Sequence, residues 1–213
     1  MSDLITLPWV LERDAPPFEG NDIKSPEGFY RHIYKQYTKR GDKIFDPFAG
    51  MGTSLFVAEE MKRTYYGFEA EEEKYEWVAG QLEHWTHLIG DDAARIDKYK
   101  LPKMDLIITS PPFMEAHTKW NPLYGGDPKF AGYEKYLKRM AFIFSKCLPL
   151  MKKKTPLIIQ LDNIKNGKKF TPLISDIAYA LKKDFIQIDQ VTVLWGKAKP
   201  DYTHTQYLAF NKR

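Results

Sequence analysis

Residues 43–61 read KIFDPFAGMGTSLFVAEEM, and this stretch predicts the type of fold. It begins with a short predicted strand, Lys43–Phe45. Two glycines follow, Gly50 and Gly52, and glycine lets a backbone turn sharply or approach a ligand closely. Apolar residues then recur at helical spacing: Leu55, Ala58 and Met61. A strand, a glycine turn and a helix in this order are typical of one unit of an alternating α/β fold.

The same alternation continues along most of the chain. Further strands are predicted at Thr64–Phe68, Asp105–Thr109, Leu157–Leu161, Ile186–Leu194 and Tyr207–Phe210. Helices are predicted from an N-cap at Ser25 to Tyr37, from Tyr75 to Ile89, from Tyr133 to Met151 and over Leu173–Leu181. This order predicts a parallel-type sheet with helices on both faces, and the two strands in succession at the end predict an antiparallel hairpin.

Length and composition favour one globular domain with a sizeable core. The chain has 213 residues, of which 43% are apolar, and no apolar run approaches the roughly 18 residues that span a membrane. The start, MSDLITLPWV, lacks the basic residues of a signal peptide. A single cysteine, Cys147, cannot build a disulfide framework. We therefore expect a cytoplasmic protein in a reducing setting, without a membrane partner.

The charge is distributed unevenly along the chain. Residues 1–113 carry 14 basic and 20 acidic side chains, whereas residues 138–213 carry 15 basic and 5 acidic side chains. Such asymmetry often marks a surface that faces a polyanion, although lysines in loops are common for other reasons.

An acidic residue, Glu69, ends the strand that follows the glycine turn. An acid at this place typically binds the ribose hydroxyls of a nucleoside. Leu55 stands where a pyrophosphate-binding turn has its third glycine, and no lysine follows, so the turn suits a nucleoside without phosphates. Asp46 is an acceptor at the end of the first strand. Asp91 or Asp92 either holds an adenine amine or caps a loop, and both alternatives stay open.

The strand Asp105–Thr109 ends on Ser110, Pro111, Pro112 and Phe113. Each proline fixes its own backbone and restricts the residue before it to extended geometry. Taken alone, the four residues favour a tight exit from a buried strand. They also form a rigid elbow that presents a hydroxyl, carbonyl oxygens and an aromatic ring.

The motifs DPFAGMGTS (46–54) and TSPPF (109–113), in this order, resemble those of the S-adenosylmethionine-dependent DNA amino-methyltransferases. The serine before the prolines is most like the cytosine-N4 enzymes. GFEAEEEKY (67–75) is similar to the ribose-binding segment of the family, and the resemblance covers nearly the whole chain after about residue 23. It implies a Rossmann-like α/β fold with a mostly parallel seven-stranded sheet that ends in an antiparallel hairpin.

The resemblance implies S-adenosylmethionine as cofactor. The candidate cofactor-binding residues are Asp46, Phe48, Ala49, Gly50, Gly52, Glu69, Asp91 and Asp92. The candidate catalytic residues are Ser110, Pro111, Pro112 and Phe113, and no metal ligand is expected. A weaker match at Ser25 and Pro26 implies a segment that closes over the methionine end of the cofactor. Phe113 stands where tyrosine is commoner in the cytosine-N4 enzymes.

An exocyclic base amine is a poor nucleophile, because its lone pair is delocalised into the ring. If Ser110 and the Pro111 carbonyl accept its hydrogen bonds, the lone pair is freed and the charge that develops on nitrogen is stabilised. The target base must leave the duplex, and Phe113 can stack on it. The expected product is N4-methylcytosine. Carbon-5 methylation needs a cysteine nucleophile, and Cys147 fits the apolar stripe of a helix instead.

Three alternatives stay open: adenine as the acceptor, RNA as the substrate, and a non-catalytic protein that binds nucleic acid or S-adenosylmethionine. Double-stranded DNA is the expected partner, and a cognate restriction endonuclease is a further candidate partner. The basic residues expected to face DNA are Lys152–Lys154, Lys165, Lys168, Lys169, Lys197 and Lys199. His84 and His87, on the predicted helix, are interpreted as surface residues rather than metal ligands.

We expect residues 1–213 to form a single methyltransferase domain, monomeric or homodimeric, with an N-terminal arm at residues 1–23. A loop at residues 114–132 is expected to be mobile and to face the substrate. This loop carries His117, Trp120 and Tyr124, and it is a candidate to contact the bases beside the target or to fill the gap left by the flipped base. Alternatively, Trp120 pins the loop to the body.

Overall fold

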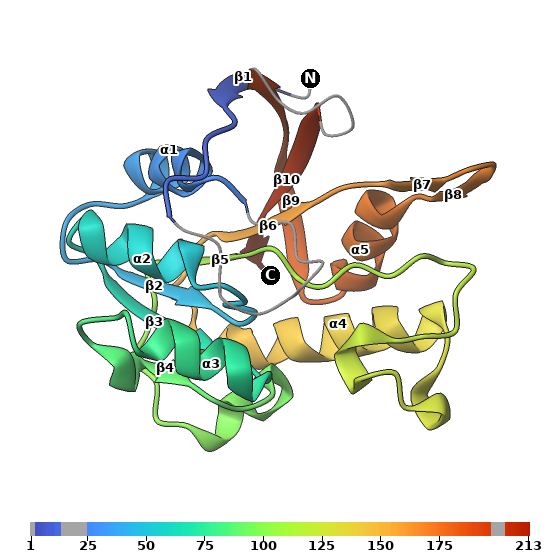
Figure 1. Ribbon diagram of the computed structural model, residues 1–213, viewed down its shortest axis with the longest axis horizontal. Helices are drawn as coiled ribbons and strands as arrows, with labels where there is room; N and C mark the ends of the chain where they lie inside the picture. Colours follow the sequence, from blue (N-terminus) through green and yellow to red (C-terminus); the bar gives the residue numbers. More distant parts are fainter. Residues whose placement is uncertain (1–2, 14–24, 197–202) are drawn as a thin grey trace.

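The computed structural model describes residues 3–13, 25–196 and 203–213. Its main feature is an eight-stranded sheet in the order β1-β9-β10-β6-β5-β2-β3-β4 (Figure 1). The strands are β1 (Asp3–Pro8), β2 (Lys43–Asp46), β3 (Thr64–Phe68), β4 (Leu88–Ile89), β5 (Leu106–Thr109), β6 (Leu157–Leu161), β9 (Phe185–Gly196) and β10 (His204–Lys212). Only β10 runs antiparallel to its neighbours in this sheet, β6 and β9. The predicted fold class is therefore confirmed.

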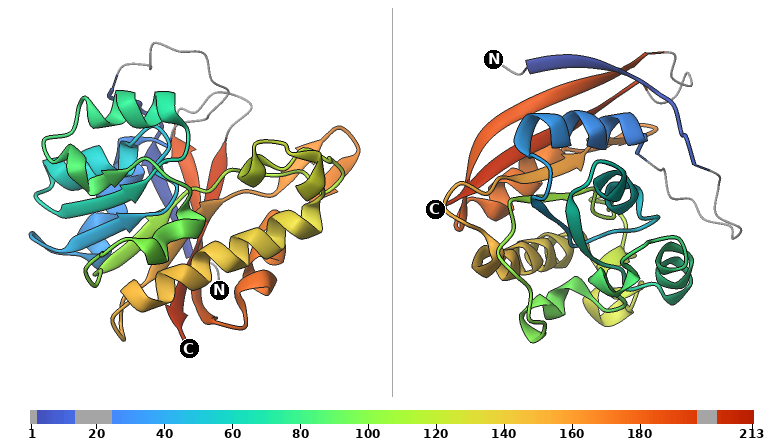
Figure 2. Two further views of the ribbon diagram at one scale, coloured as in Figure 1. Left: turned by 90° about the horizontal axis from the view of Figure 1, so that it is seen from below. Right: turned by 90° about the vertical axis from the view of Figure 1, so that its left-hand side faces the viewer.

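Helices cover both faces of the sheet (Figure 2). On one face lie α1 (Glu27–Tyr37), α2 (Thr53–Glu60) and α3 (Glu72–Ala79), and on the other lie α4 (Tyr133–Cys147) and α5 (Leu173–Leu181). Successive residues of β6 alternate between the two cores, because side chains along a strand point to opposite faces. Both layers are needed because a parallel sheet is apolar on both sides.

The sheet has eight strands rather than the seven expected, and the additional strand is β1. Its six residues pair in parallel with β9, from Asp3 opposite Val191 to Pro8 opposite Gly196. Every second side chain in most of β1 is exposed, so the segment carries only a weak apolar pattern. Part of the predicted N-terminal arm is therefore an edge strand.

The helix predicted from Tyr75 to Ile89 is wrong in its second half. Helix α3 ends before Gly80, residues 85–87 form a short 3₁₀ helix, and Leu88–Ile89 form the edge strand β4. Backbone pairing with β3 accounts for the difference, since the Glu69 N–H donates to the Ile89 carbonyl at 3.0 Å. His84 and His87 are consequently not on an α-helix, and the His87 ring stacks on Tyr66 with 4.6 Å between centroids.

Two helix ends also differ from the prediction. Ser25 does not cap α1: its hydroxyl donates to the Gln160 side chain at 2.7 Å, and the helix has no side-chain cap. Helix α4 ends at Cys147 rather than Met151, because Pro149 lacks the N–H that a further turn needs and residues 148–150 form a 3₁₀ turn. Cys147 is fully buried, and burial raises the pKa of its thiol, as its interpretation as a core residue requires.

The predicted bounds of β3, β6 and α5 are confirmed to the residue. A small hairpin, β7 (Ile164–Asn166) and β8 (Lys169–Thr171), was not predicted, and it extends beyond the sheet after β6 (Figure 1). No helix in the described part of the chain combines the length and apolar character that crossing a bilayer requires.

Candidate active site

Four neighbouring parallel strands bring the candidate site residues together at their carboxyl ends. The glycine turn follows β2, Glu69 follows β3, Asp91 and Asp92 follow β4, and the elbow (Ser110–Phe113) follows β5. The chain proceeds from β2 outward to β3 and β4, and then returns to place β5 on the other side of β2. Ligands of open α/β sheets bind at such a reversal of strand order, beyond the carboxyl ends of the strands. The glycine turn and the elbow lie on its two sides.

The glycine turn requires both of its glycines. Gly50 and Gly52 have positive φ angles of 53° and 72°. A Cβ on Gly52 would lie 2.5 Å from a methyl carbon of Val78 on α3, so α3 packs directly on the turn. The Ala49 N–H donates to the Phe68 carbonyl at 2.9 Å and fixes the turn to β3.

The buried Asp46 stabilises this turn through two hydrogen bonds. Its carboxylate accepts a hydrogen bond from the Ser54 hydroxyl at 2.5 Å and another from the Phe48 N–H at 3.0 Å. Burial raises the pKa of Asp46 to about 6, although both hydrogen bonds oppose the shift. The acceptor predicted at Asp46 is thus used by donors of the chain itself.

Glu69 closes the glycine turn on its other side. One carboxylate oxygen accepts from the Gly50 N–H and the other from the Glu71 N–H, each at 2.8 Å. The side chain is buried, and burial raises the pKa of Glu69 to about 7. Each oxygen keeps a further lone pair, so two neighbouring hydroxyls of a ligand have acceptors here.

The two aspartates after β4 are already engaged by the protein. Asp92 caps a 3₁₀ helix (Ala93–Lys98) by accepting from the Ala94 N–H at 2.8 Å, and it forms an ion pair with Arg139 of α4. Asp91 accepts from the Tyr99 hydroxyl at 2.8 Å. The capping role is therefore present for Asp92, while contact with an adenine amine stays a prediction.

Helix α4 holds the elbow in place through a hydrogen bond. Pro111 is buried, whereas Ser110, Pro112 and Phe113 are half-buried. The buried Tyr136 hydroxyl donates to the Pro112 carbonyl at 3.0 Å. Within the described residues, the Ser110 hydroxyl makes no hydrogen bond of its own. The elbow therefore has one carbonyl fixed by the protein and one hydroxyl free to bind a ligand.

Sequence reasoning missed Tyr136 and Gln160 as residues of this region. Tyr136 lies in the helix predicted from Tyr133 to Met151, and its hydroxyl was the available signal, because a buried tyrosine hydroxyl usually has a hydrogen-bond partner. Gln160 lies fully buried near the carboxyl end of β6. Its hydrogen bond with Ser25 brings the segment before α1 to the same end of the strands. A glutamine inside the otherwise apolar strand LIIQL was the available signal.

The loop at residues 114–132 contains two short 3₁₀ turns, Pro122–Tyr124 and Pro128–Phe130. Trp120 is 61% exposed, yet its indole packs on Gly126 of the same loop. Tyr124 stacks on Phe130 with 4.2 Å between centroids. A cavity of about 350 Å³ lies between this loop and α4, lined by Tyr124, Phe130, Lys135, Lys138, Arg139 and Phe142. The Tyr124 and Phe130 rings pack within the loop and against α4, whereas Trp120 contacts its own loop, so both alternatives for Trp120 stay open.

Comparisons with known proteins agree with this arrangement. Residues 9–80 match the family model described as DNA methylase. The chain is 38% identical over 60 residues to type II methyltransferase M2.DpnII of Streptococcus pneumoniae, over 28% of this chain and 22% of that protein. It is 42% identical over 57 residues to type II methyltransferase M.BglII of Bacillus subtilis, over 27% and 16%. The chain thus spans less than a quarter of the length of these curated relatives.

Solved structures match over much more of the chain. A methyltransferase from Pyrococcus furiosus has a TM-score of 0.58 at 14% identity, over 94% of this chain and 88% of that one. A SAM dependent methyltransferase from Aquifex aeolicus has a TM-score of 0.54 at 14% identity, over 85% and 89%. At such identity the likeness shows the fold alone. The family match confirms the resemblance to the DNA amino-methyltransferases over the segment that holds the glycine turn and Glu69.

Proposed function

We propose that this relative of the DNA methylases transfers a methyl group from S-adenosylmethionine to the exocyclic amine of a base in DNA. One observation carries the proposal: the glycine turn closed by Glu69 and the Ser-Pro-Pro-Phe elbow lie at the carboxyl ends of neighbouring strands. A nucleoside held by the first motif has its reactive end beside the second. The whole chain, residues 1–213, is proposed as one methyltransferase domain.

The glycine turn and Glu69 are proposed to bind the cofactor. Phe48, Ala49, Gly50 and Gly52 would line it, and the free lone pairs of Glu69 would accept the two ribose hydroxyls. Asp46 would act indirectly, since its carboxylate holds the turn in shape. Asp91 and Asp92 are the proposed neighbours of the adenine, with Asp92 kept in place by Arg139.

The elbow is proposed to bind the amine that receives the methyl group. The Ser110 hydroxyl and the Pro111 carbonyl accept its two N–H bonds, which frees the nitrogen lone pair. S-adenosylmethionine, when bound, supplies the methyl group: a carbon–nitrogen bond forms, the carbon–sulfur bond breaks, and sulfur leaves as a neutral thioether. The nitrogen then returns to neutrality by losing one proton to solvent. Holding the two reactants in line supplies a further part of the rate enhancement.

Cytosine is the proposed base, flipped out of the duplex and stacked on Phe113. The serine before the prolines favours cytosine through the family resemblance. Adenine presents an amine beside a ring nitrogen in the same way, so it is the second candidate. A cognate restriction endonuclease and a monomeric or homodimeric state stay predictions.

Mass spectrometry of nucleosides tests the proposal. The protein is incubated separately with DNA and with RNA, each time with S-adenosylmethionine that carries a labelled methyl group, and the nucleic acid is then digested. Label in N4-methylcytosine is expected, and label in N6-methyladenine would keep the enzyme class and change the base. Label in RNA alone would overturn the substrate. No label in either nucleic acid, with the cofactor bound, would favour a non-catalytic binding protein.

A further inference from the structure

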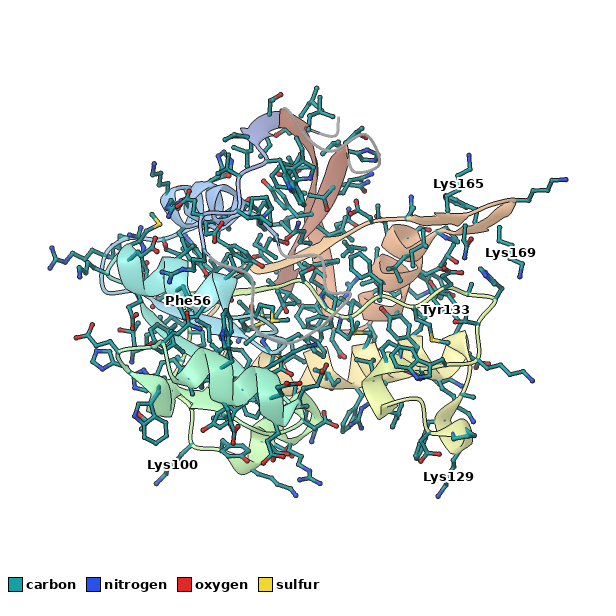
Figure 3. The ribbon with its side chains drawn as sticks, viewed as in Figure 1. Phe56, Lys100, Lys129, Tyr133, Lys165 and Lys169 are labelled. Atoms are coloured by element: carbon teal, nitrogen blue, oxygen red, sulfur yellow. The ribbon has the colours of Figure 1, made fainter. Side chains whose placement is uncertain are left out.

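The β7–β8 hairpin projects beyond the sheet in Figure 1. It starts three residues after β6, and its turn contains Gly167 with a positive φ of 58°. Three of the residues between 164 and 171 are lysines, and none of the residues in this range is acidic. Figure 3 labels two of these lysines, Lys165 and Lys169, at this projecting end.

The pairing of the two strands assigns each side chain to a face. Lys165 lies opposite Phe170, and Asn166 lies opposite Lys169. Opposite residues share a face and successive residues alternate, so Lys165 and Phe170 lie on one face of the hairpin. The Phe170 side chain is 60% exposed although it is large and apolar. An exposed apolar ring beside a cation is a common feature of surfaces that bind nucleic acid.

The hairpin is also joined to the segment that follows the elbow. The Ala116 N–H donates to the buried Thr171 hydroxyl at 2.9 Å. The Asn166 amide donates to the Glu115 carboxylate at 3.1 Å, and the His117 Nε2 lies 2.6 Å from the same carboxylate. Residues 115–117 follow Phe113 by only two to four positions. The hairpin is therefore positioned by the same segment that leads out of the candidate catalytic elbow.

The three hairpin lysines are exposed, and within the described residues they form no ion pair. The second lysine cluster, Lys152–Lys154, lies at the opposite end of the strands, where β5 and β6 begin. Lys152 forms an ion pair with Asp105, which precedes β5, whereas the hairpin contacts residues that follow β5. The basic residues that the sequence grouped together therefore lie at opposite ends of the strands. Of these two clusters, the hairpin is the one on the side of the elbow. Lys197 and Lys199 lie outside the described residues.

We infer that the β7–β8 hairpin is the element of this chain that binds double-stranded DNA beside the target base. Its lysines contact phosphates, and the Phe170 ring packs against the sugar and base surface next to them. The cluster Lys152–Lys154 stays free of DNA. This inference rests on the proposed function, since it names how the substrate of that site is held.

Two matched double variants test the inference. They are Lys168→Ala/Lys169→Ala in the hairpin and Lys153→Ala/Lys154→Ala at the other end of the strands. Each removes two adjacent exposed lysines and the same charge. Duplex affinity is measured by fluorescence anisotropy over a range of salt concentrations. The slope of log affinity against log salt changes by about 0.9 for each phosphate contact. The hairpin variant should therefore lose nearly two units of slope and roughly tenfold or more in affinity, and the control should keep both.

Phe170→Ala gives an independent readout, because it removes no charge. It should weaken duplex binding without changing the salt slope. Circular dichroism of each variant, and its affinity for S-adenosylmethionine, should match those of the wild type. If the control double variant loses slope and the hairpin variant does not, the inference is overturned and the proposed function stands. If the wild type binds S-adenosylmethionine but no DNA, or only RNA, both the inference and the proposed DNA substrate are overturned.

Discussion

At the scale of single residues, the buried carboxyl group of Glu69 is sensitive to pH near neutrality. Burial raises its pKa to about 7, so close to neutral pH it is only partly ionised. The ionised form is the better acceptor for ribose hydroxyls, and ligand binding is therefore linked to loss of a proton. Because the pKa of the folded protein lies above that of the unfolded chain, Glu69 also favours folding less as the pH rises through about 7.

We expect the affinity for adenosine to rise about tenfold between pH 6 and pH 8, because the ionised fraction of Glu69 rises by about that factor. Adenosine serves as the ligand because it carries the ribose hydroxyls and has no group that titrates in this range. Calorimetry on Glu69→Gln should show no such rise, and at pH 8 its affinity should be roughly tenfold lower than that of the wild type. A wild-type affinity independent of pH would contradict the assignment of Glu69 to the ribose.

Ser110 is the residue whose loss should separate catalysis from binding. Ser110→Ala should bind S-adenosylmethionine as the wild type does, yet methylate DNA about 10²-fold more slowly, since the lost acceptor acts mainly in the transition state. Single-turnover kinetics measures the rate, and calorimetry measures the affinity. Ser175→Ala is the control, because among the described residues this exposed hydroxyl bonds only the Pro172 carbonyl of its own helix start. Equal rates for the two variants would remove Ser110 from the mechanism.

At the scale of elements, the glycine turn and helix α3 form one packed unit. Gly52 has a positive φ and also leaves room for Val78, whereas Gly41 has a positive φ of 85° and open space where a Cβ would stand. The two positions therefore separate backbone strain from steric overlap. Since α3 begins three residues after Glu69, an overlap at Gly52 also disturbs the carboxylate that closes the turn.

Gly41→Ala is expected to lower the free energy of unfolding by about 1–2 kcal/mol, the cost of a side chain in the left-handed region. Gly52→Ala should lower it by about 3 kcal/mol or more, because overpacking against the stiff Val78 side chain adds about 1–3 kcal/mol. Urea denaturation measures both values. The double variant Gly52→Ala/Val78→Ala should be less destabilised than the two single changes predict together. Equal costs at the two glycines would show that the packing of α3 on the turn is unimportant.

At the scale of the whole molecule, the N-terminal segment is tied to the body by ion pairs and hydrogen bonds. The buried Glu27 carboxylate of α1 accepts from the backbone N–H groups of Glu12 and Arg13 at 3.1 and 3.3 Å. Arg31 forms ion pairs with Glu12 and with Glu60 of α2. These contacts join β1, at one edge of the sheet, to the helices beside the glycine turn.

Glu27→Ala should destabilise the protein by about 1–3 kcal/mol, because two partly buried N–H groups lose their acceptor. Glu134→Ala is the matched control: it also removes an acid from the first turn of a helix, but this side chain is exposed. Hydrogen exchange should be faster at the amides of Glu12 and Arg13 in the first variant only. Unchanged exchange at these two amides would mean that Glu27 does not hold the segment.

The sequence alone determined the local structure and the chemistry of the motifs. The bounds of β3, β6 and α5, the glycine turn at Gly50 and Gly52, and the rigid elbow all follow from side-chain periodicity and from the backbone preferences of glycine and proline. These preferences act within a few residues, so they are legible in a short stretch. Glu69 was found in this way, at the end of its strand.

Only the tertiary structure decided which segments meet. Apolar spacing predicted a helix through Ile89, but pairing with β3 makes this residue part of a strand. The half-exposed strand β1 has no strong apolar pattern, and the β7–β8 hairpin was not predicted. The two lysine clusters lie at opposite ends of the strands, although the sequence grouped them together. Periodicity reports which side of a segment is buried, whereas strand order depends on hydrogen bonds and packing between residues far apart in the chain. That is why the elbow could be predicted, and its bond to Tyr136 could not.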